Sequence, residues 1–105
     1  MTDLEMTTLC AEAIGLHVGR IIVDSVFVCD SDEDIPTIQY DPLHDDAQAM
    51  ALVKKFALCV WQATWNPDQP WYVEAFRASP EYRFAGNVDL NRAIVECVSR
   101  MQAEK

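Results

Sequence analysis

The stretch RIIVDSVFVC, residues 20–29, decides the fold, because it is the longest run of β-branched and aromatic side chains in the sequence. In an extended chain, side chains alternate between two faces. Apolar residues occupy both faces here: Ile21, Val23, Phe27 and Cys29 on one, and Ile22, Val26 and Val28 beside Asp24 on the other. A strand that is apolar on both faces is typical of a sheet covered on both sides, so we expect helices on each side of it.

The segment that precedes this strand has the pattern of an amphipathic helix. Thr2 and Glu5 have the spacing of a capping box, and Gly15 supplies a residue suited to the left-handed conformation that ends a helix. Between them, apolar residues recur at helical spacing along one stripe: Met6, Leu9, Cys10, Ala13 and Ile14.

Two further helices are predicted along the chain. Asp41 is suited to cap the second and Pro42 to its first position, with Lys54 and Lys55 near its C-terminal end. Asn87 or Asp89 caps the third. Its buried stripe consists of Leu90, Ile94, Cys97, Val98 and Met101.

Short strands complete the pattern. IPTIQY (35–40) is expected to return antiparallel at a sheet edge, because Pro36 cannot donate to a ladder. LCVWQATW (58–65) and WYVEAFRA (71–78) flank a turn and predict a hairpin. We therefore expect an α+β fold in the order α-β-β-α-β-β-α. Three helices would pack on a mostly antiparallel four-stranded sheet as an α-β-α sandwich.

Length and composition bound the class of protein. The 105 residues suit one domain, 1–105, and a hydrophobic fraction of 50% with ten aromatic residues excludes a disordered chain. No apolar run approaches the 18 residues that a membrane span needs. The N-terminal MTDLEM has no basic region typical of a secretory signal, so we expect a cytoplasmic protein.

The net charge of −9 is concentrated in the first half of the chain. Residues 1–46 hold 11 acidic residues and one basic residue, whereas residues 47–105 hold six and seven. Such an excess disfavours direct binding of nucleic acid, which needs Lys and Arg, and it suits a basic protein partner. A merely solvated acidic face is the alternative. The candidate acidic surface comprises Asp30, Asp32, Glu33, Asp34, Asp41, Asp45 and Asp46.

Neither metal chemistry nor catalysis is indicated. The four cysteines lack a C-x-x-C pair and are interpreted as buried hydrophobic residues in a reducing compartment rather than as disulfides. The run DSDED (30–34) begins like a calcium loop, but Ile35 and Asp41 stand where Gly and Glu are needed, which leaves only weak cation binding as an alternative. His17 and His44 have no nucleophile in local motif spacing, so no enzymatic activity and no cofactor are predicted.

A second candidate surface is aromatic. Trp61, Trp65, Trp71 and Tyr72 all belong to the predicted hairpin. They could simply pack in the core. Because Trp and Tyr are frequent anchors at protein interfaces, Trp65, Trp71 and Tyr72 also form a candidate patch for a partner, with Trp65 and Trp71 flanking the turn.

Three segments carry a family resemblance: L-x-A-E-A-I-G-L-H (9–17), YDP-x-x-DDAQAMALVKKF (40–56) and NRAIVECVSRM (91–101). Together they resemble the small phage and prophage proteins that contain an ABA sandwich domain. Asp45 and Asp46 stand where that family has a Ser-x-Asp entry to the helix, and the acidic run 30–34 has no counterpart there. The resemblance implies a viral origin, the cytoplasm of a bacterial host as the location, and this fold, but no reaction.

The acidic surface therefore predicts an interaction protein, and the resemblance implies that it is of phage origin. It would inhibit a host protein with a basic surface, such as a nucleic-acid-binding CRISPR effector, by offering an anionic face to a channel built for phosphates. Two alternatives remain. One is a structural phage protein that self-associates as a homodimer through a sheet edge or the Trp hairpin, and the other is a weak metal-binding domain.

Overall fold

A computed structural model describes residues 1–22, 25–29, 38–63, 65, 70–75 and 84–104. It contains three helices and six short strands, and none of these helices is long and apolar enough to cross a membrane. The elements in chain order are α1 (Asp3–Ala13), β1 (His17–Ile22), β2 (Ser25–Cys29), β3 (Ile38–Tyr40), α2 (Asp46–Phe56), β4 (Cys59–Gln62), β5 (Trp71–Glu74), β6 (Phe84–Asn87) and α3 (Leu90–Ala103).

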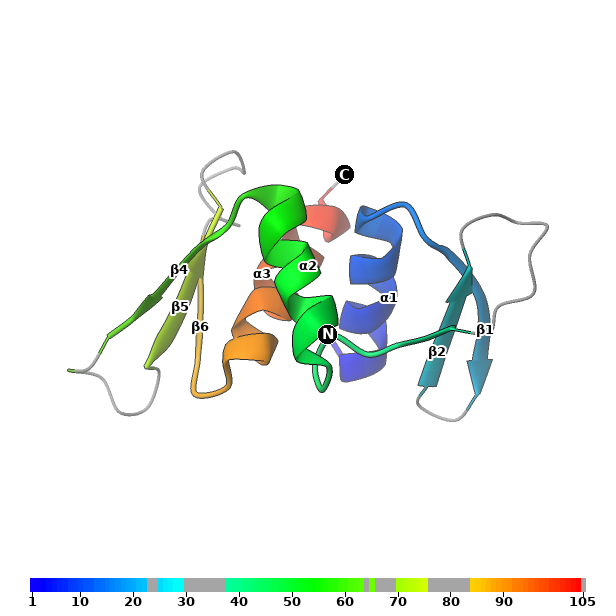
Figure 1. Cartoon of the computed structure of the whole chain (residues 1–105), viewed down its shortest axis with the longest axis horizontal. Helices are drawn as coiled ribbons and strands as arrows, with labels where there is room; N and C mark the ends of the chain where they lie inside the picture. Colours follow the sequence, from blue (N-terminus) through cyan, green and yellow to red (C-terminus); the bar gives the residue numbers. More distant parts are fainter. Residues whose placement is uncertain (23–24, 30–37, 64, 66–69, 76–83, 105) are drawn as a thin grey trace.

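The described strands form two antiparallel sheets, and the helices lie between them (Figure 1). One sheet has the order β1-β2-β3 and the other β4-β5-β6. The α+β class, the three helices and the antiparallel pairing are confirmed. The layer order differs from the predicted one: instead of one four-stranded sheet covered by helices on both faces, a helical layer is covered by a three-stranded sheet on each side.

The difference arises within the stretch 20–29. This segment belongs to two strands, because Ile22 pairs with Ser25 across a hairpin, and the pairing register also shifts between Val18 and Arg20. Apolar residues on both apparent faces therefore belong to β1 and β2 separately. Val26 faces the helices and is 1% exposed, whereas Ile22 remains about half exposed, so the sheet needs a helical cover on one side only.

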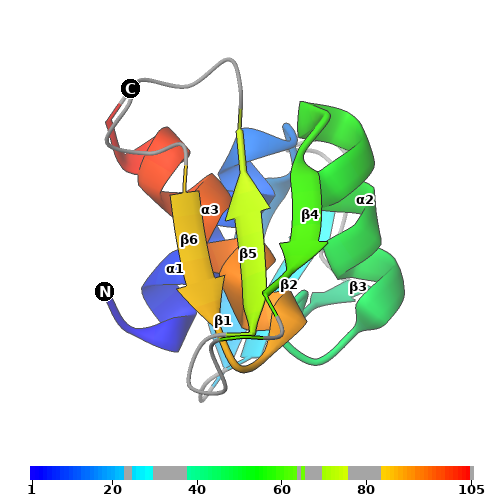
Figure 2. The ribbon, with the colours of Figure 1, turned by 90° about the vertical axis from the view of Figure 1, so that its left-hand side faces the viewer.

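The second sheet contains the predicted hairpin. β4 pairs with β5 from Cys59 opposite Glu74 to Gln62 opposite Trp71. β6 adds a third antiparallel strand on the other side of β5. Figure 2 looks onto this sheet, with α3 directly behind it.

One hydrophobic core joins the three layers. α3 contacts the second sheet, α2 and α1, and α1 also contacts the first sheet. The central position of α3 explains why six of its residues are buried, including Ile94 and Val98, and why Leu52 of α2 is completely inaccessible. The layers extend along one axis, so the molecule measures 47 × 25 × 22 Å.

The helix ends agree with the sequence patterns at three of the four predicted positions. Thr2 accepts a hydrogen bond from the Glu5 amide at 3.1 Å, Gly15 has φ +83°, and Asp89 caps α3. The predicted cap of α2 was wrong. Asp45 holds that position, because the Asp41 carbonyl instead accepts hydrogen bonds from the amides of the following turn, including that of Asp45 at 2.8 Å.

Candidate functional site

The three helices run parallel, and their N-terminal ends lie together along one edge of the molecule (Figures 1 and 2). Acidic residues occupy their caps or first turns: Asp3 in α1, Asp45 and Asp46 in α2, and Asp89 at the cap of α3. Helix N-termini carry a partial positive charge, which a carboxylate stabilises. We call these residues together with Asp41 the acidic edge. The basic residues in the last turns, Lys54, Lys55 and Arg100, lie at the opposite ends of their helices.

Two contacts of the acidic edge connect helices to one another. Arg92 of α3 donates from Nη2 to both carboxylate oxygens of Asp3, at 2.8 and 2.9 Å, which ties α3 to α1. Asn91 donates from Nδ2 to Asp46 at 2.8 Å, which ties α3 to α2. These contacts orient the helix ends relative to one another. Because both are exposed, the remaining lone pairs of the Asp3 and Asp46 carboxylates stay accessible to solvent.

The remaining carboxylates of the acidic edge hold local structure. Asp45 accepts from the Gln48 amide at 3.1 Å, and Asp89 accepts from the amides of Asn91 and Arg92. All five carboxylates have a partner among the described residues, Asp41 through His44, and within that part of the chain only Asp3 is paired with a permanently charged group. The edge keeps a net negative charge.

The structure thus brings together three of the seven predicted acidic residues, Asp41, Asp45 and Asp46. Asp30, Asp32, Glu33 and Asp34 lie outside the described residues. Asp3 and Asp89 were missed as members of the surface, although Asp89 belongs to the cap pattern of α3 and Asp3 directly follows the cap Thr2 of α1. What the sequence lacked was the parallel arrangement that puts three helix starts at one edge.

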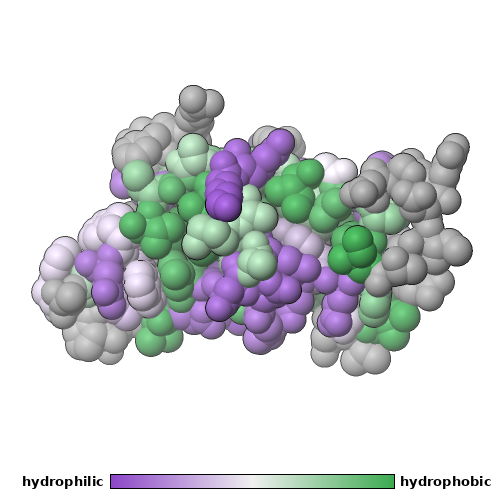
Figure 3. Space-filling view, in the orientation of Figure 1, coloured by the Kyte–Doolittle hydropathy of each residue, from purple (hydrophilic) through white to green (hydrophobic). Residues whose placement is uncertain are grey.

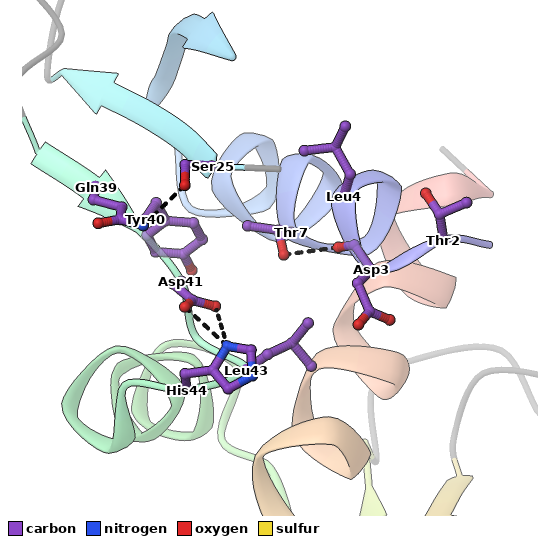
Figure 4. A pocket seen from close by; sticks show the side chains of 10 residues that line it. All are labelled: Thr2, Asp3, Leu4, Thr7, Ser25, Gln39, Tyr40, Asp41, Leu43 and His44. Atoms are coloured by element: carbon purple, nitrogen blue, oxygen red, sulfur yellow. Dashed lines mark hydrogen bonds and ion pairs between the residues drawn. The ribbon is translucent and has the colours of Figure 1, made fainter. Parts of the chain in front are cut away.

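A hollow of about 490 Å³ opens beside the acidic edge, between α1 and the turn that joins β3 to α2 (Figure 4). Asp3, Leu4 and Thr7 contribute from α1. Tyr40, Asp41, Leu43 and His44 contribute from the end of β3 and the following turn, and Thr2, Ser25 and Gln39 complete the lining.

Two side chains on the wall formed by the turn are hydrogen-bonded to each other. Nδ1 of His44 lies 2.9 Å from Oδ2 and 3.1 Å from Oδ1 of Asp41. Because an ionised carboxylate only accepts hydrogen bonds, Nδ1 carries the proton in this contact. The His44 side chain is 79% exposed and that of Asp41 is 36% exposed. The pair therefore lies at the open side of the hollow.

Tyr40 lies in the deeper wall of the hollow. The residue is only 4% exposed, and its hydroxyl is buried without a hydrogen-bond partner among the described residues. Burial raises the pKa of this phenol above its ordinary value, and the neighbouring Cys10 thiol raises it further. In Figure 4 the hydroxyl points away from Gln39, towards the side of the hollow where Asp41 lies.

The candidate aromatic patch is only partly accessible. Trp65 is 75% exposed and lies 6.2 Å from Trp61, which stacks on Tyr72 at 4.6 Å between ring centroids. Tyr72 is 8% exposed, so this residue, unlike Trp65, does not offer a contact surface. Trp71 is half-buried, because it shares the helix-facing side of β5 with Val73.

All four cysteines are free thiols. Cys10, Cys29 and Cys97 are buried as predicted, but Cys59 is exposed, because it lies on the outer face of the edge strand β4. Burial raises the pKa of Cys10 to about 12 and that of Cys97 to about 11. The described residues include no group of three metal-ligating side chains, and the calcium-like run 30–34 lies outside them.

The surface agrees with this placement of charge. In Figure 3, hydrophilic side chains gather at the lower centre of the visible face, over the N-terminal ends of the helices.

A comparison with known proteins finds no family model, no curated protein and no solved structure that matches the chain.

Proposed function

We propose that this chain is a small acidic interaction protein that binds a basic surface of a nucleic-acid-binding host protein and blocks it. The observation that carries the proposal is the acidic edge, where three helix starts present Asp3, Asp41, Asp45, Asp46 and Asp89 together. The resemblance to phage proteins with an ABA sandwich domain extends the proposal to a counter-defence role.

Electrostatics explain how such an edge would work. Carboxylates on one edge create a negative potential that steers a basic partner during diffusion. The edge would then occupy the basic surface on which the partner otherwise holds the phosphates of a nucleic acid. Lys54, Lys55 and Arg100 lie at the other ends of their helices, so the resulting charge separation also orients the encounter. Binding by this route weakens as salt screens the charges.

The decisive experiment removes charge without removing helix caps. A triple variant with Asp41→Asn, Asp45→Asn and Asp46→Asn keeps side chains that cap helices well. The matched control, Glu12→Gln with Glu74→Gln and Glu104→Gln, removes three charges elsewhere in the molecule.

Crosslinking in a bacterial lysate would first identify a nucleic-acid-binding partner, whose affinity is then measured from low to high salt. We expect the triple variant to bind at least tenfold more weakly than the control at low salt, with the two converging at high salt. Equal affinities of the two variants, or affinity that does not change with salt, would refute the proposal.

Self-association is the second candidate, and the exposed apolar residues favour it. Trp65 is 75% exposed, and Ile38 is 57% exposed in the edge strand β3. Unpaired strand edges can pair with a second copy. Light scattering of the purified chain would distinguish the two readings: a stable dimer that Trp65→Ser dissociates supports self-association, and a monomer at all concentrations excludes it.

A further inference from the structure

The hollow beside the acidic edge has hydrogen-bond acceptors on two facing walls. On the wall formed by the turn, the two oxygens of Asp41 share a single imidazole N–H, so most of their lone pairs remain available. On the wall formed by α1, Thr7 donates its hydroxyl proton to the Asp3 carbonyl at 2.8 Å, which leaves its own lone pairs as acceptors. Leu4 and Leu43 add apolar surface between the walls.

The unpartnered hydroxyl of Tyr40 gives a second and independent indication of a ligand. Buried polar groups in proteins nearly always have a partner, and each exception calls for an explanation. This hydroxyl is buried in the wall of a hollow that is otherwise open to solvent. A ligand that donates a hydrogen bond to its oxygen would supply the missing partner.

We propose that this hollow receives an arginine side chain of the basic partner. The guanidinium lies between the Asp41 carboxylate and the Tyr40 hydroxyl, and the aliphatic stem packs on Leu4 and Leu43. The source of the arginine rests on the function proposed above, because the hollow adjoins the acidic edge.

Arginine fits this site better than lysine does. A guanidinium presents five N–H donors in a rigid plane and can therefore reach acceptors on two walls at once, whereas an ammonium is a compact and strongly hydrated point charge. The rim already contains one such contact, since Arg92 donates to both oxygens of Asp3. Surfaces that bind phosphates are also rich in arginine.

The test uses the purified full chain and two small probes. N-acetyl-arginine amide is titrated while nuclear magnetic resonance follows the Tyr40 ring and the Asp41 amide. N-acetyl-citrulline amide, which has nearly the same shape but no charge, is the control probe. We expect the arginine probe to bind in the millimolar range and the citrulline probe at least tenfold more weakly. Equal shifts from the two probes, or none at Tyr40 and Asp41, overturn the proposal.

Three variants locate the contact. Asp41→Asn and Tyr40→Phe should each weaken binding of the arginine probe at least threefold. Glu12→Gln, a matched loss of charge at the far end of α1, should leave it unchanged. If Tyr40→Phe binds as the wild type does, the hydroxyl is only an unpaired core atom, and the proposed role of Tyr40 is wrong.

The outcome separates this inference from the function on which it rests. Loss of partner binding in Asp45→Asn with Asp46→Asn, together with no binding of the arginine probe, would keep the acidic interaction protein and remove the arginine site. Arginine binding in the hollow, together with a partner affinity that does not change with salt, would keep the arginine site and remove the acidic interaction mechanism.

Discussion

Replacing Tyr40 by phenylalanine should stabilise the protein, although the tyrosine is among its most buried aromatic residues. The hydroxyl has no described partner, so the folded state bears the cost of desolvating it. That cost is about 1–3 kcal/mol for a buried polar group. Tyr40→Phe removes it and leaves a gap of about 15 Å³, which costs about 0.4 kcal/mol at 24 cal/mol per Å³. The net gain should be about 1 kcal/mol or more.

Chemical denaturation at neutral pH measures this gain directly. We expect a higher denaturant midpoint with an unchanged slope, because the change lies in the folded state. For a domain of this size the gain corresponds to a rise in Tm of about 5 °C.

The alkaline range supplies a second readout for the same variant. Because burial raises the pKa of the Tyr40 phenol, the folded state keeps its proton above the ordinary value of about 10, where the unfolded state loses it. The contribution of Tyr40 to stability is therefore complete below pH 10 and declines above it. Tyr40→Phe should lose this decline. A variant that is no more stable than the wild type at neutral pH would refute the reasoning, because the hydroxyl would then have a partner.

Three further predictions follow from the helix ends and the buried thiols. Burial raises the pKa of Cys10 to about 12 and of Cys97 to about 11, so the unfolded state releases these protons first. Unfolding curves from pH 8 to 10.5 should show stability falling above pH 9 by up to about 1.4 kcal/mol per pH unit for each thiol. Cys10→Ala with Cys97→Ala should flatten that decline, and an unchanged decline would place its cause elsewhere. Asp89→Ala removes the cap of α3 and should cost about 1 kcal/mol in denaturant unfolding, whereas Asp89→Asn should stay near the wild type. Gly15 and Ala57 both have positive φ, so thermal unfolding should show Gly15→Ala destabilised and Ala57→Gly stabilised, each by about 1 kcal/mol; shifts in the same direction would contradict this.

Local signals in the sequence predicted most elements, because each depends on residues within one turn or one hairpin. Thr2 with Glu5, Gly15 and Asp89 all act where the patterns placed them. The cap of α2 failed for an equally local reason: two aspartates four residues apart compete for it, and Asp41 is bound by the intervening turn, including His44. Ala57 gave no signal at all, since alanine rarely takes the left-handed conformation that it has at the end of α2.

The layer order could not be read from local signals. A long apolar run predicts one central strand equally well as two strands of a hairpin, and only the pairing of Ile22 with Ser25 decides between them. The same limit applies to the candidate site. Tyr40 and Thr7 belong to different elements and meet in one hollow only because α1 packs against the first sheet. A site whose residues are brought together by such long-range packing has no characteristic motif in the sequence.

The carboxylates of the acidic edge have a structural cause, which determines how each of them acts in binding. Parallel helices place their positive ends at one edge, so carboxylates such as Asp45 and Asp89 are needed there for folding. Their near oxygens are therefore occupied by amides of the chain itself. Such a carboxylate therefore attracts a partner through its electrostatic field rather than through hydrogen bonds to two free oxygens. Neutralising Asp45 should consequently slow association and weaken its salt dependence while changing dissociation little, whereas a change at Asp41, beside the hollow, should act mainly on dissociation. Stopped-flow measurements with the two single Asn variants would separate these effects, and equal effects of both on dissociation would show that the edge binds as one surface.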